Sequence, residues 1–594
     1  MALLGQVEAR SSRGRLIHGA IILVLIVGGV TMVYPFAIML SGSLRSEMDQ
    51  ADLDLVPSFW TDEAALYRKF LETKYNQDIE ALNRAHLRGY FSFRDVADPR
   101  LPSETNSPDT AAAAQRLNAF VQETDLPHHW QVLGGIAGVG TVPEPLRELR
   151  RRLKARYQDD LDAFSRDVGA PTLSWLAVSL PVPAWTSRRY NFEPNALYQT
   201  YFQLLDEAPP AQRQLVSLTG AFLQAIIYPQ YGRIDTAAYN AAHAVHLKTF
   251  GDFRLPATVP GPDQPRLRGE WIEFVTKELH PSFITLAQVS QADYDAFLQQ
   301  AFEGETRWPL PDGHTWLSGA QREAYERFLE TRLVEHYVLV GPEYLFGQAE
   351  LPHAVAALEY QYARDHATAL RGTYSIRNYL TVLDELVFQG RPLINTVIFC
   401  FLAISAALLI NPLAAYALSR YQLPGTYKVL LFLMATIAFP PMVTLIPQFI
   451  LLRKLHLLNT FFALMLPLMA NGYMIFLLKG FFDSLPRELY EAARIDGASE
   501  MRMFFQITMA LSKPILAVLA LGTFTHAYLM FLYPLLVAPD QDMWLISVWL
   551  FQYQQRASSA GIYASIILAS IPTLLIFLFA QRTIMRGIVV PTEK

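Results

Sequence analysis

The stretch Tyr490–Phe505, "YEAARIDGASEMRMFF", lies between two apolar runs and decides how the rest of the chain is interpreted. Pro486 suits the first turn of a helix, and Ala492 and Ala493 then belong to a small apolar face of that helix. Gly497 stands where the chain can turn without side-chain strain. A short helix with a small, flat exposed face suits a groove on another protein. The alternative is an amphipathic linker on a membrane surface.

The composition indicates a membrane protein with a soluble middle. Of the 594 residues, 52% are hydrophobic and 17% are charged, whereas soluble domains carry about 25% charge. The charge deficit is concentrated near the N-terminus and after Pro392. A net charge of −5 gives no basic footprint for nucleic acid. The only cysteine, Cys400, lies in an apolar run, which excludes an intrachain disulfide and predicts inert packing.

Six apolar segments have the length that a bilayer core requires, about 20 residues in helix. The first is too long for a removed signal peptide and lacks its cleavage site. The fourth contains Asn471 and Gly472, and we weigh a helix-packing notch against a substrate contact there. The six segments are Ile17–Leu40, Leu393–Leu413, Val429–Leu452, Phe461–Leu478, Ile515–Val537 and Ile562–Ala580.

Basic residues predict the orientation of these spans. They gather before the first span, between the second and third, between the fourth and fifth, and after the last, so the positive-inside rule puts those segments in the cytoplasm. Arg453 and Lys454 fall on the other side. Both termini are then cytoplasmic, and residues 46–376 are extracytoplasmic. The basic residues that carry this prediction are Arg10, Arg13, Arg15, Arg420, Lys428, Lys479, Arg487, Arg494, Arg502, Lys513, Arg582 and Arg586.

The predicted spans contain no motor and no obvious ion relay. No Asp or Glu falls within them, although intramembrane carboxylates are the usual relays of secondary carriers. His526 lies well inside a span, where a hydrogen-bonded packing role is the simpler interpretation. The dipeptide Gly-Lys of a phosphate-binding loop does not occur. We therefore expect no catalytic, cofactor or metal site in this chain. The energy is expected to be supplied by a separate subunit.

Several ordered motifs resemble ABC-importer permeases of the maltose (MalG-like) type. Glu491-Ala492-Ala493 followed by Gly497 and Ile507 is similar to the EAA motif of that family. The family's Leu-Pro after the isoleucine is absent, and Pro514 stands nearby. In that family this helix docks into the ATPase, which implies that Glu491 meets a basic residue there. The resemblance implies coupling roles for Glu491, Ala492, Ala493, Asp496, Gly497 and Ile507.

Other segments agree with this resemblance, which covers about the first 45 residues and everything after about residue 375. The family's Trp-Asn of the fifth span is replaced by Tyr528-Leu529. Possible pore-lining residues are Asn471, Gly472, His526 and Tyr528. The resembling segments are Tyr34–Arg45, Asn378–Leu383, Asn395-Thr396, Asn411–Gly425, Phe439–Leu452 and Ile571–Gly587.

The resemblance implies an all-α polytopic protein of the bacterial inner membrane with six transmembrane helices. Its parts would be residues 1–45 with the first helix, an inserted extracytoplasmic domain at 46–376, and a five-helix core at 377–594 with a coupling loop at 486–513. Implied partners are a MalF-like permease, an ATPase dimer that holds ATP and Mg, and an extracytoplasmic solute-binding protein. The implied substrate is a sugar or oligosaccharide.

Segment 46–376 has internal echoes that predict degenerate, mostly helical modules. "YRKFLETK" at Tyr67–Lys74 matches "YERFLETR" at Tyr325–Arg332, and "YNQDIEALNRA" at Tyr75–Ala85 matches "YQDDLDAFSRD" at Tyr157–Asp167. Weaker copies are predicted to start at Tyr239 and Tyr294. The stretch 74–96 also resembles a helix–turn segment of some β-galactosidase-type hydrolases, without their catalytic carboxylates.

Two functions of this segment stay open on the sequence alone. We favour a docking platform for the binding protein over a domain that itself captures substrate. Its tryptophans are expected in the core rather than on sugars; they are Trp130, Trp175, Trp185, Trp271, Trp308 and Trp316. A membrane-anchored extracytoplasmic enzyme or receptor is the alternative function for the whole chain.

Overall fold

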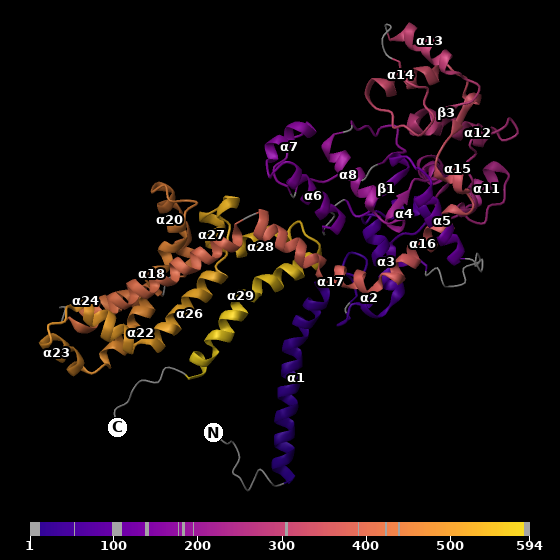
Figure 1. The fold of residues 1–594 in the computed structure, drawn as a ribbon. Coiled ribbons are helices and arrows are strands. Elements are labelled where there is room, and N and C mark those ends of the chain that lie inside the picture. The colour runs from indigo at the N-terminus through magenta and orange to yellow at the C-terminus, as the bar shows by residue number, and fades with distance from the viewer. Residues whose placement is uncertain are drawn as a thin grey trace. The chain divides into compact units, whose positions relative to one another are not determined.

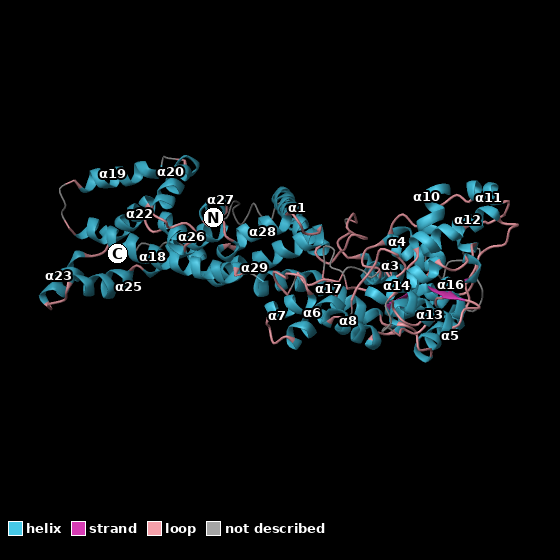
Figure 2. Cartoon of the chain, turned by 90° about the horizontal axis from the view of Figure 1, so that it is seen from above, coloured by secondary structure: helices cyan, strands magenta, loops and turns pink. Residues whose placement is uncertain are grey.

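The structure, a computed structural model, describes residues 12–586 except 53, 98–109, 137–141, 176, 181–183, 194, 303–306, 390, 422–424 and 438–439. Arg10 and Gly587, which the sequence analysis used, lie outside the described residues. The described chain is mostly helical with a few short strands (Figures 1 and 2). It divides into two compact units, Met1–Asn378 with Ser558–Ala560, and Tyr379–Ala557 with Gly561–Lys594. The first predicted span therefore groups with the first unit.

The first unit is built from short helices and two pairs of strands. β1 pairs with β2 in antiparallel fashion, and β3 pairs with β4 likewise. Its elements are α1 (Ser12–Gly42), α2 (Ser58–Thr61), α3 (Glu63–Lys74), α4 (Ile79–His86), α5 (Thr110–Glu123), β1 (Gln131–Leu133), α6 (Glu144–Arg156), α7 (Leu161–Val168), α8 (Ala196–Glu207), β2 (Arg213–Leu215), α9 (Leu218–Phe222), α10 (Tyr228–Tyr231), α11 (Ala237–His243), α12 (Pro265–Glu273), β3 (Ile284–Leu286), α13 (Gln291–Ala301), α14 (Gly319–Glu330), β4 (Tyr337–Leu339), α15 (Pro342–Phe346), α16 (Leu351–Asp365) and α17 (Ala367–Leu383).

Six tryptophans of this unit form part of its core, as the sequence predicts, whereas Trp60 is 44% exposed. Trp130, Trp185 and Trp271 are almost completely buried. Trp175, Trp308 and Trp316 are half-buried and pack against the same hydrophobic cluster. The rings of these six residues are therefore used for packing.

The match between Tyr75–Ala85 and Tyr157–Asp167 corresponds to one repeated backbone turn. Asn76 and Gln77 both have positive φ angles, 53° and 63°, and so do Gln158 and Asp159, 51° and 68°. The next residue in each copy is an aspartate whose side chain accepts a hydrogen bond from the start of the following helix, α4 or α7. Aspartate is a favoured N-cap because its carboxylate satisfies a free N–H group.

The third and fourth copies were predicted with the wrong starting residue. Tyr239 was aligned with Tyr75, the first residue of the motif. Asp235 instead accepts from the backbone N–H of Ala237, as Asp78 accepts from that of Glu80. Tyr239 therefore corresponds to Leu82, four residues after the aspartate, and it is equally buried.

The fourth copy follows the same corrected frame. Tyr294 lies four residues after the capping Ser290 of α13 and is fully buried. A bulky side chain at this position fixes each helix in the core, and aromatic rings satisfy that requirement as well as leucine does. The sequence comparison therefore matched tyrosines that have different structural roles.

A buried polar cluster is also repeated. The Tyr75 hydroxyl donates to Glu359 Oε1 at 2.6 Å, and His86 Nε2 lies 2.7 Å from Glu359 Oε2. The second set consists of Tyr231, His243 and Glu270, with corresponding distances of 2.7 and 2.9 Å. Each carboxylate ties a short helix to a longer one, α4 to α16 and α11 to α12, because a buried carboxylate requires partners.

The second unit contains the remaining predicted spans. Helices α22 and α26 both pack along α18 (Figure 1). Its helices are α18 (Pro392–Arg420), α19 (Thr426–Ile437), α20 (Pro441–Lys454), α21 (Phe461–Met465), α22 (Gly472–Asp483), α23 (Arg487–Ile495), α24 (Glu500–Arg502), α25 (Met509–Leu511), α26 (Lys513–Leu529), α27 (Leu532–Val537), α28 (Ile546–Gln554) and α29 (Ser559–Arg586).

Three described helices are long and apolar enough to cross a membrane: His18–Gly42, Pro392–Arg420 and Ser559–Gln581. Two bent pairs raise the number to as many as five. One pair, Phe461–Leu468 with Gly472–Asp483, matches the predicted fourth span, which is broken at Asn471 by an angle of 51°. Val429–Leu452, predicted as one span, corresponds to the separate helices α19 and α20.

Candidate functional site

The stretch Tyr490–Phe505 forms two helices joined by a tight turn. α23 ends at Ile495, and Gly497 adopts φ +75°. The N–H of Gly497 donates to the Arg494 carbonyl at 3.0 Å and that of Ala498 to the Ala493 carbonyl at 2.9 Å, which closes the end of the helix. Only glycine takes this left-handed conformation without steric cost. The predicted turn at Gly497 is confirmed.

Small and apolar side chains are exposed around this turn. Glu491, Ala492 and Asp496 are exposed, and Ala493 is half-buried. Ile495 is 87% exposed, and Met501 beyond the turn is 60% exposed. Exposed apolar groups of this size, next to a charged residue, are typical of an interaction surface. We call the exposed face of residues 491–501 the loop surface.

Tyr490 attaches the loop surface to neighbouring helices. Its side chain is buried, and its hydroxyl lies 2.8 Å from Thr508 Oγ1, which is also buried. The Arg420 guanidinium carbon lies 3.7 Å from the centroid of the Tyr490 ring, and Arg420 Nη2 donates to the Phe482 carbonyl at 2.7 Å. The loop is therefore attached to the C-terminal ends of both α18 and α22.

A second polar chain crosses the turn. Glu500 accepts from the Tyr416 hydroxyl at 2.8 Å and from Arg494 Nη2 at 3.1 Å. The Tyr416 ring packs edge-on against Phe504 with centroids 5.4 Å apart. Because Tyr416 belongs to α18, a movement of the loop relative to its anchor has to break these contacts. The sequence analysis missed Tyr416 and Tyr490 as anchors, although Tyr416 falls in the resembling segment Asn411–Gly425.

Ile507 does not belong to the exposed part of the motif. It is half-buried and packs against the cluster that contains Phe504 and Ile515. The helical stretch Glu500–Leu511 then meets Lys513–Leu529 at an angle of 83°. Pro514 lies in the first turn after this bend, where a missing N–H is tolerated. Ser512 and Pro514 thus stand at a sharp bend that follows the motif.

Asn471 and Gly472 are involved in helix packing. Asn471 caps α22, its Oδ1 accepting from the Met474 N–H at 3.1 Å, and its own N–H donates to Asn411 Oδ1 at 2.8 Å. A Cβ atom at Gly472 would collide with the carbonyl oxygen of Leu433 on α19. These contacts match the helix-packing notch. A pore-lining role for either residue stays a prediction.

His526 and Tyr528 lie on different faces of α26. Tyr528 is half-buried, and its hydroxyl donates to the Ala569 carbonyl of α29. Its ring stacks on Phe524 with centroids 5.5 Å apart. His526 is exposed. Tyr528 thus has a structural contact that occupies its hydroxyl, and His526 is the more accessible of the two candidates.

Comparison with known proteins assigns most of the second unit to a protein family. Residues 410–590 match the family described as "Binding-protein-dependent transport system inner membrane component". The chain is also 33% identical over 201 residues to the diacetylchitobiose uptake system permease protein NgcG of Streptomyces coelicolor, over 33% of this chain and 67% of that protein. The chain belongs to this permease family. This membership favours a transport role over the alternative of a membrane-anchored enzyme or receptor.

Two further similarities fall in the same region. The chain is 33% identical over 207 residues to the sn-glycerol-3-phosphate transport system permease protein UgpE of Yersinia pestis, over 34% of this chain and 73% of that protein. A solved bacterial ABC transporter involved in importing the acidic polysaccharide alginate shares 23% identity, with a TM-score of 0.31, over 34% of this chain and 78% of that chain. These matches cover about a third of the permease described here.

Proposed function

We propose that this permease is a transmembrane subunit of an ATP-driven importer for a sugar or oligosaccharide. The family membership supports transport. The name of NgcG supports a saccharide, and that of UgpE supports a small polyol derivative. The partners in this proposal are a MalF-like permease, an ATPase dimer that carries ATP and Mg, and an extracytoplasmic solute-binding protein. Residues 46–376 form an extracytoplasmic insertion, and both termini are cytoplasmic.

The observation that carries the proposal is the loop surface together with its anchors. Glu491 and Ala492 are exposed while the adjacent Tyr490 is buried and held by Arg420 and Thr508. A partner that binds the exposed side is thus linked to α18 through the contact between Tyr490 and Arg420. ATP-driven closure of the two ATPase subunits would move this loop and change which side of the membrane the pore faces.

The roles of individual residues follow from their exposure. Glu491 would pair with a basic group of the ATPase, and Ala492, Ala493 and Gly497 would let the two backbones approach closely. Asp496 would present a second carboxylate at the rim of that contact. Ile507 would support the loop from inside, because it is half-buried.

The test is co-purification of the ATPase with tagged permease from cells that express the complete importer. Glu491→Lys and Gly497→Asp are expected to reduce the bound ATPase at least tenfold. Asp540→Lys, a charge reversal at an exposed residue outside the loop, serves as the matched control. Unchanged ATPase in both loop variants, or solute uptake that persists after ATP depletion, would refute the proposal.

A further inference from the structure

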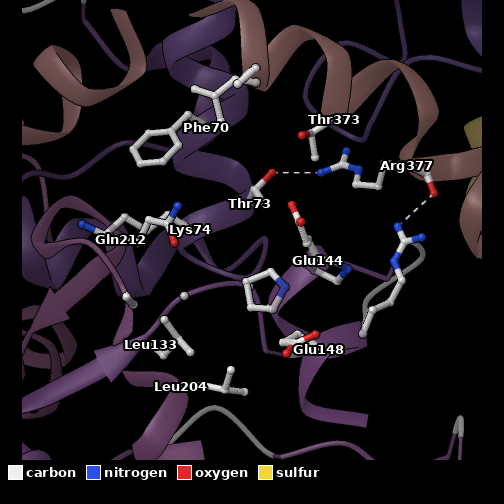
Figure 3. Close-up of a pocket in the computed structure, with 18 of the residues that line it drawn as sticks. Phe70, Thr73, Lys74, Leu133, Glu144, Glu148, Leu204, Gln212, Thr373 and Arg377 are labelled. Carbon is white, nitrogen blue, oxygen red and sulfur yellow. Dashed lines mark hydrogen bonds between the residues drawn. The ribbon is translucent and has the colours of Figure 1, made fainter. Parts of the chain in front are cut away.

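The first unit contains a cavity of about 610 Å³ beside the N-terminal and middle turns of α17. Its walls come from α3, α6 and α8 and from the consecutive helices α16 and α17, so three separate regions of the sequence contribute to one space (Figure 3). All of these residues belong to the same compact unit. The volume falls within the range of about 300–1,000 Å³ that small-molecule pockets have.

Small residues contribute to the lining, among them Gly134, Ala208, Ala369 and Thr373. A hydrogen bond joins two of the wall helices, α17 and α3, because Arg377 Nη1 donates to Thr73 Oγ1 at 2.9 Å (Figure 3).

One wall is additionally fixed by a buried ion pair. Lys74 Nζ lies 2.5 Å from Glu359 Oε1, and both side chains are at most 3% exposed. On the same side, Gln212 Nε2 donates to the Tyr362 hydroxyl at 2.7 Å. Lys74, Gln212 and Tyr362 line the cavity, so these contacts fix part of its wall before any ligand arrives, and such preorganisation favours binding.

The polar groups of the lining have both signs. Glu144, Glu148 and Glu207 contribute carboxylates, and Lys74, Arg147, Arg151, Arg152 and Arg377 contribute cations. Arg151 and Arg152 are bonded to Glu148, Arg152 also to Glu207, and Lys74 to Glu359. An anion such as a phosphate would meet the three carboxylates as well as the cations, and like charges in a partly buried site are unfavourable. A neutral ligand with many hydroxyl groups can use donors and acceptors together.

The remaining surface of the cavity is apolar and aromatic. Phe70 and Tyr374 are buried and line it, and Leu133 and Leu204 complete this side. Sugars present hydroxyl groups around their edges and C–H groups on their faces. A lining that combines aromatic rings with hydroxyl, amide, carboxylate and guanidinium groups matches both features.

We propose that this cavity binds a neutral saccharide of one or two rings. The choice of a saccharide rests on the proposed function, because it identifies the ligand with the transported class. In this proposal segment 46–376 holds substrate itself. Ala369, Thr373 and Arg377 lie on α17, which continues to Leu383 shortly before α18 begins. A ligand in the cavity therefore contacts the helix that leads to the second span.

The experiment measures binding to the purified full-length permease in detergent, without ATPase or solute-binding protein. The probes are maltose, diacetylchitobiose and glycerol 3-phosphate, titrated by calorimetry. We expect at least one of the two sugars to bind. Ala369→Trp, which adds a large ring at an exposed position of the lining, is expected to weaken that binding at least tenfold. Thr368→Trp is the matched control, because Thr368 is an equally exposed neighbour on the same helix that does not line the cavity.

A second variant keeps the test valid if tryptophan disturbs folding. Glu144→Gln removes a charge from an exposed side chain at the start of α6 and is expected to weaken sugar binding about five- to tenfold. Absence of sugar binding, equal binding by Ala369→Trp, or binding of glycerol 3-phosphate alone would overturn the proposal. None of these results would affect ATPase association through the loop, so the two proposals fail separately.

Discussion

The guanidinium group of Arg420 lies directly over the ring of Tyr490, with its carbon 3.7 Å from the ring centroid. Arg420 ends α18, and Tyr490 is the buried residue of α23. A cation over an aromatic face is attracted by the ring, and the attraction grows when water is excluded. The contact joins the exposed loop to the longest helix of the second unit. It is the structural basis for treating the loop as a coupling element.

Removing the cation should loosen this joint without disturbing the loop surface. Arg420→Met keeps the aliphatic stem but loses both the ring contact and the hydrogen bond to the Phe482 carbonyl. We expect a loss of about 2 kcal/mol in unfolding free energy and reduced ATP-dependent uptake with ATPase still bound. Tyr490→Phe, which removes only the hydroxyl contact with Thr508, should cost about 1 kcal/mol. Thermal unfolding and uptake by reconstituted importer measure both, and loss of bound ATPase in Arg420→Met would contradict this interpretation.

A glycine is required at position 497 because the backbone there has a positive φ angle. A side chain at this position would not collide with other residues of this chain. Nothing lies within 4 Å of a Cβ atom built there, and its φ is +75°. Gly497→Ala should therefore cost about 1–2 kcal/mol through backbone strain, whereas Gly497→Asn should cost less because asparagine tolerates this region. Both would still add atoms to the loop surface and reduce ATPase binding. Gly480→Ala, also in open space but without a positive φ, is the control. Full ATPase binding by both Gly497 variants would show that close approach is unnecessary.

The space around Gly472 leaves no room for a side chain. A methyl group there would collide with the Leu433 carbonyl, so Gly472→Ala should force α19 and α22 apart. Overpacking of this kind costs about 1–3 kcal/mol, measurable as a lower midpoint of thermal unfolding in detergent. Gly522→Ala is matched to it, because the added atom would only touch Met474 at 3.7 Å. Equal midpoints for the two variants would disprove the packing role.

Glu343 predicts a dependence of stability on pH. It is buried, and burial raises its pKa to about 7 although Thr219 and Ser217 donate hydrogen bonds to it. Because the folded pKa exceeds the unfolded value of 4.5, the protonated form favours the fold. That contribution is fully present below pH 4.5 and is lost as the pH rises through 7.

The measurement compares the wild type with Glu343→Gln at pH 5 and pH 8. The unfolding free energy of the wild type should fall by on the order of 3 kcal/mol across this interval relative to the variant. Urea unfolding followed by tryptophan fluorescence gives both values. Glu330→Gln, an exposed change on α14, should leave the wild-type pH dependence in place. Parallel curves for the wild type and Glu343→Gln would contradict the raised pKa.

Sequence patterns predicted the elements whose signals are local. Gly497 indicated a turn, the apolar runs indicated helices, and the match between Tyr75–Ala85 and Tyr157–Asp167 indicated a repeated helical module. Each of these depends on a few neighbouring residues. The resemblance to the EAA motif predicted which residues belong to this loop.

Other features could not be predicted because they depend on residues far apart in the sequence. Arg420 meets Tyr490, and Glu359 meets Tyr75 and His86, only after folding brings them together. Tyr239 was misplaced because an aromatic residue satisfies two different positions of the module. The motif included Ile507 without indicating that its side chain is half-buried, since a motif specifies residue types and not the side of the helix that a partner covers.

Asn378 has one further consequence. Its side-chain amide donates to the carbonyl of Ser43 at 2.7 Å and to that of Arg45 at 2.8 Å. The two ends of segment 46–376 are therefore neighbours in space. A short peptide in place of the segment would join Arg45 to Arg377 with little loop-closure entropy. Shortening the chain in this way would leave the carbonyl groups of Ser43 and Arg45 beside Asn378.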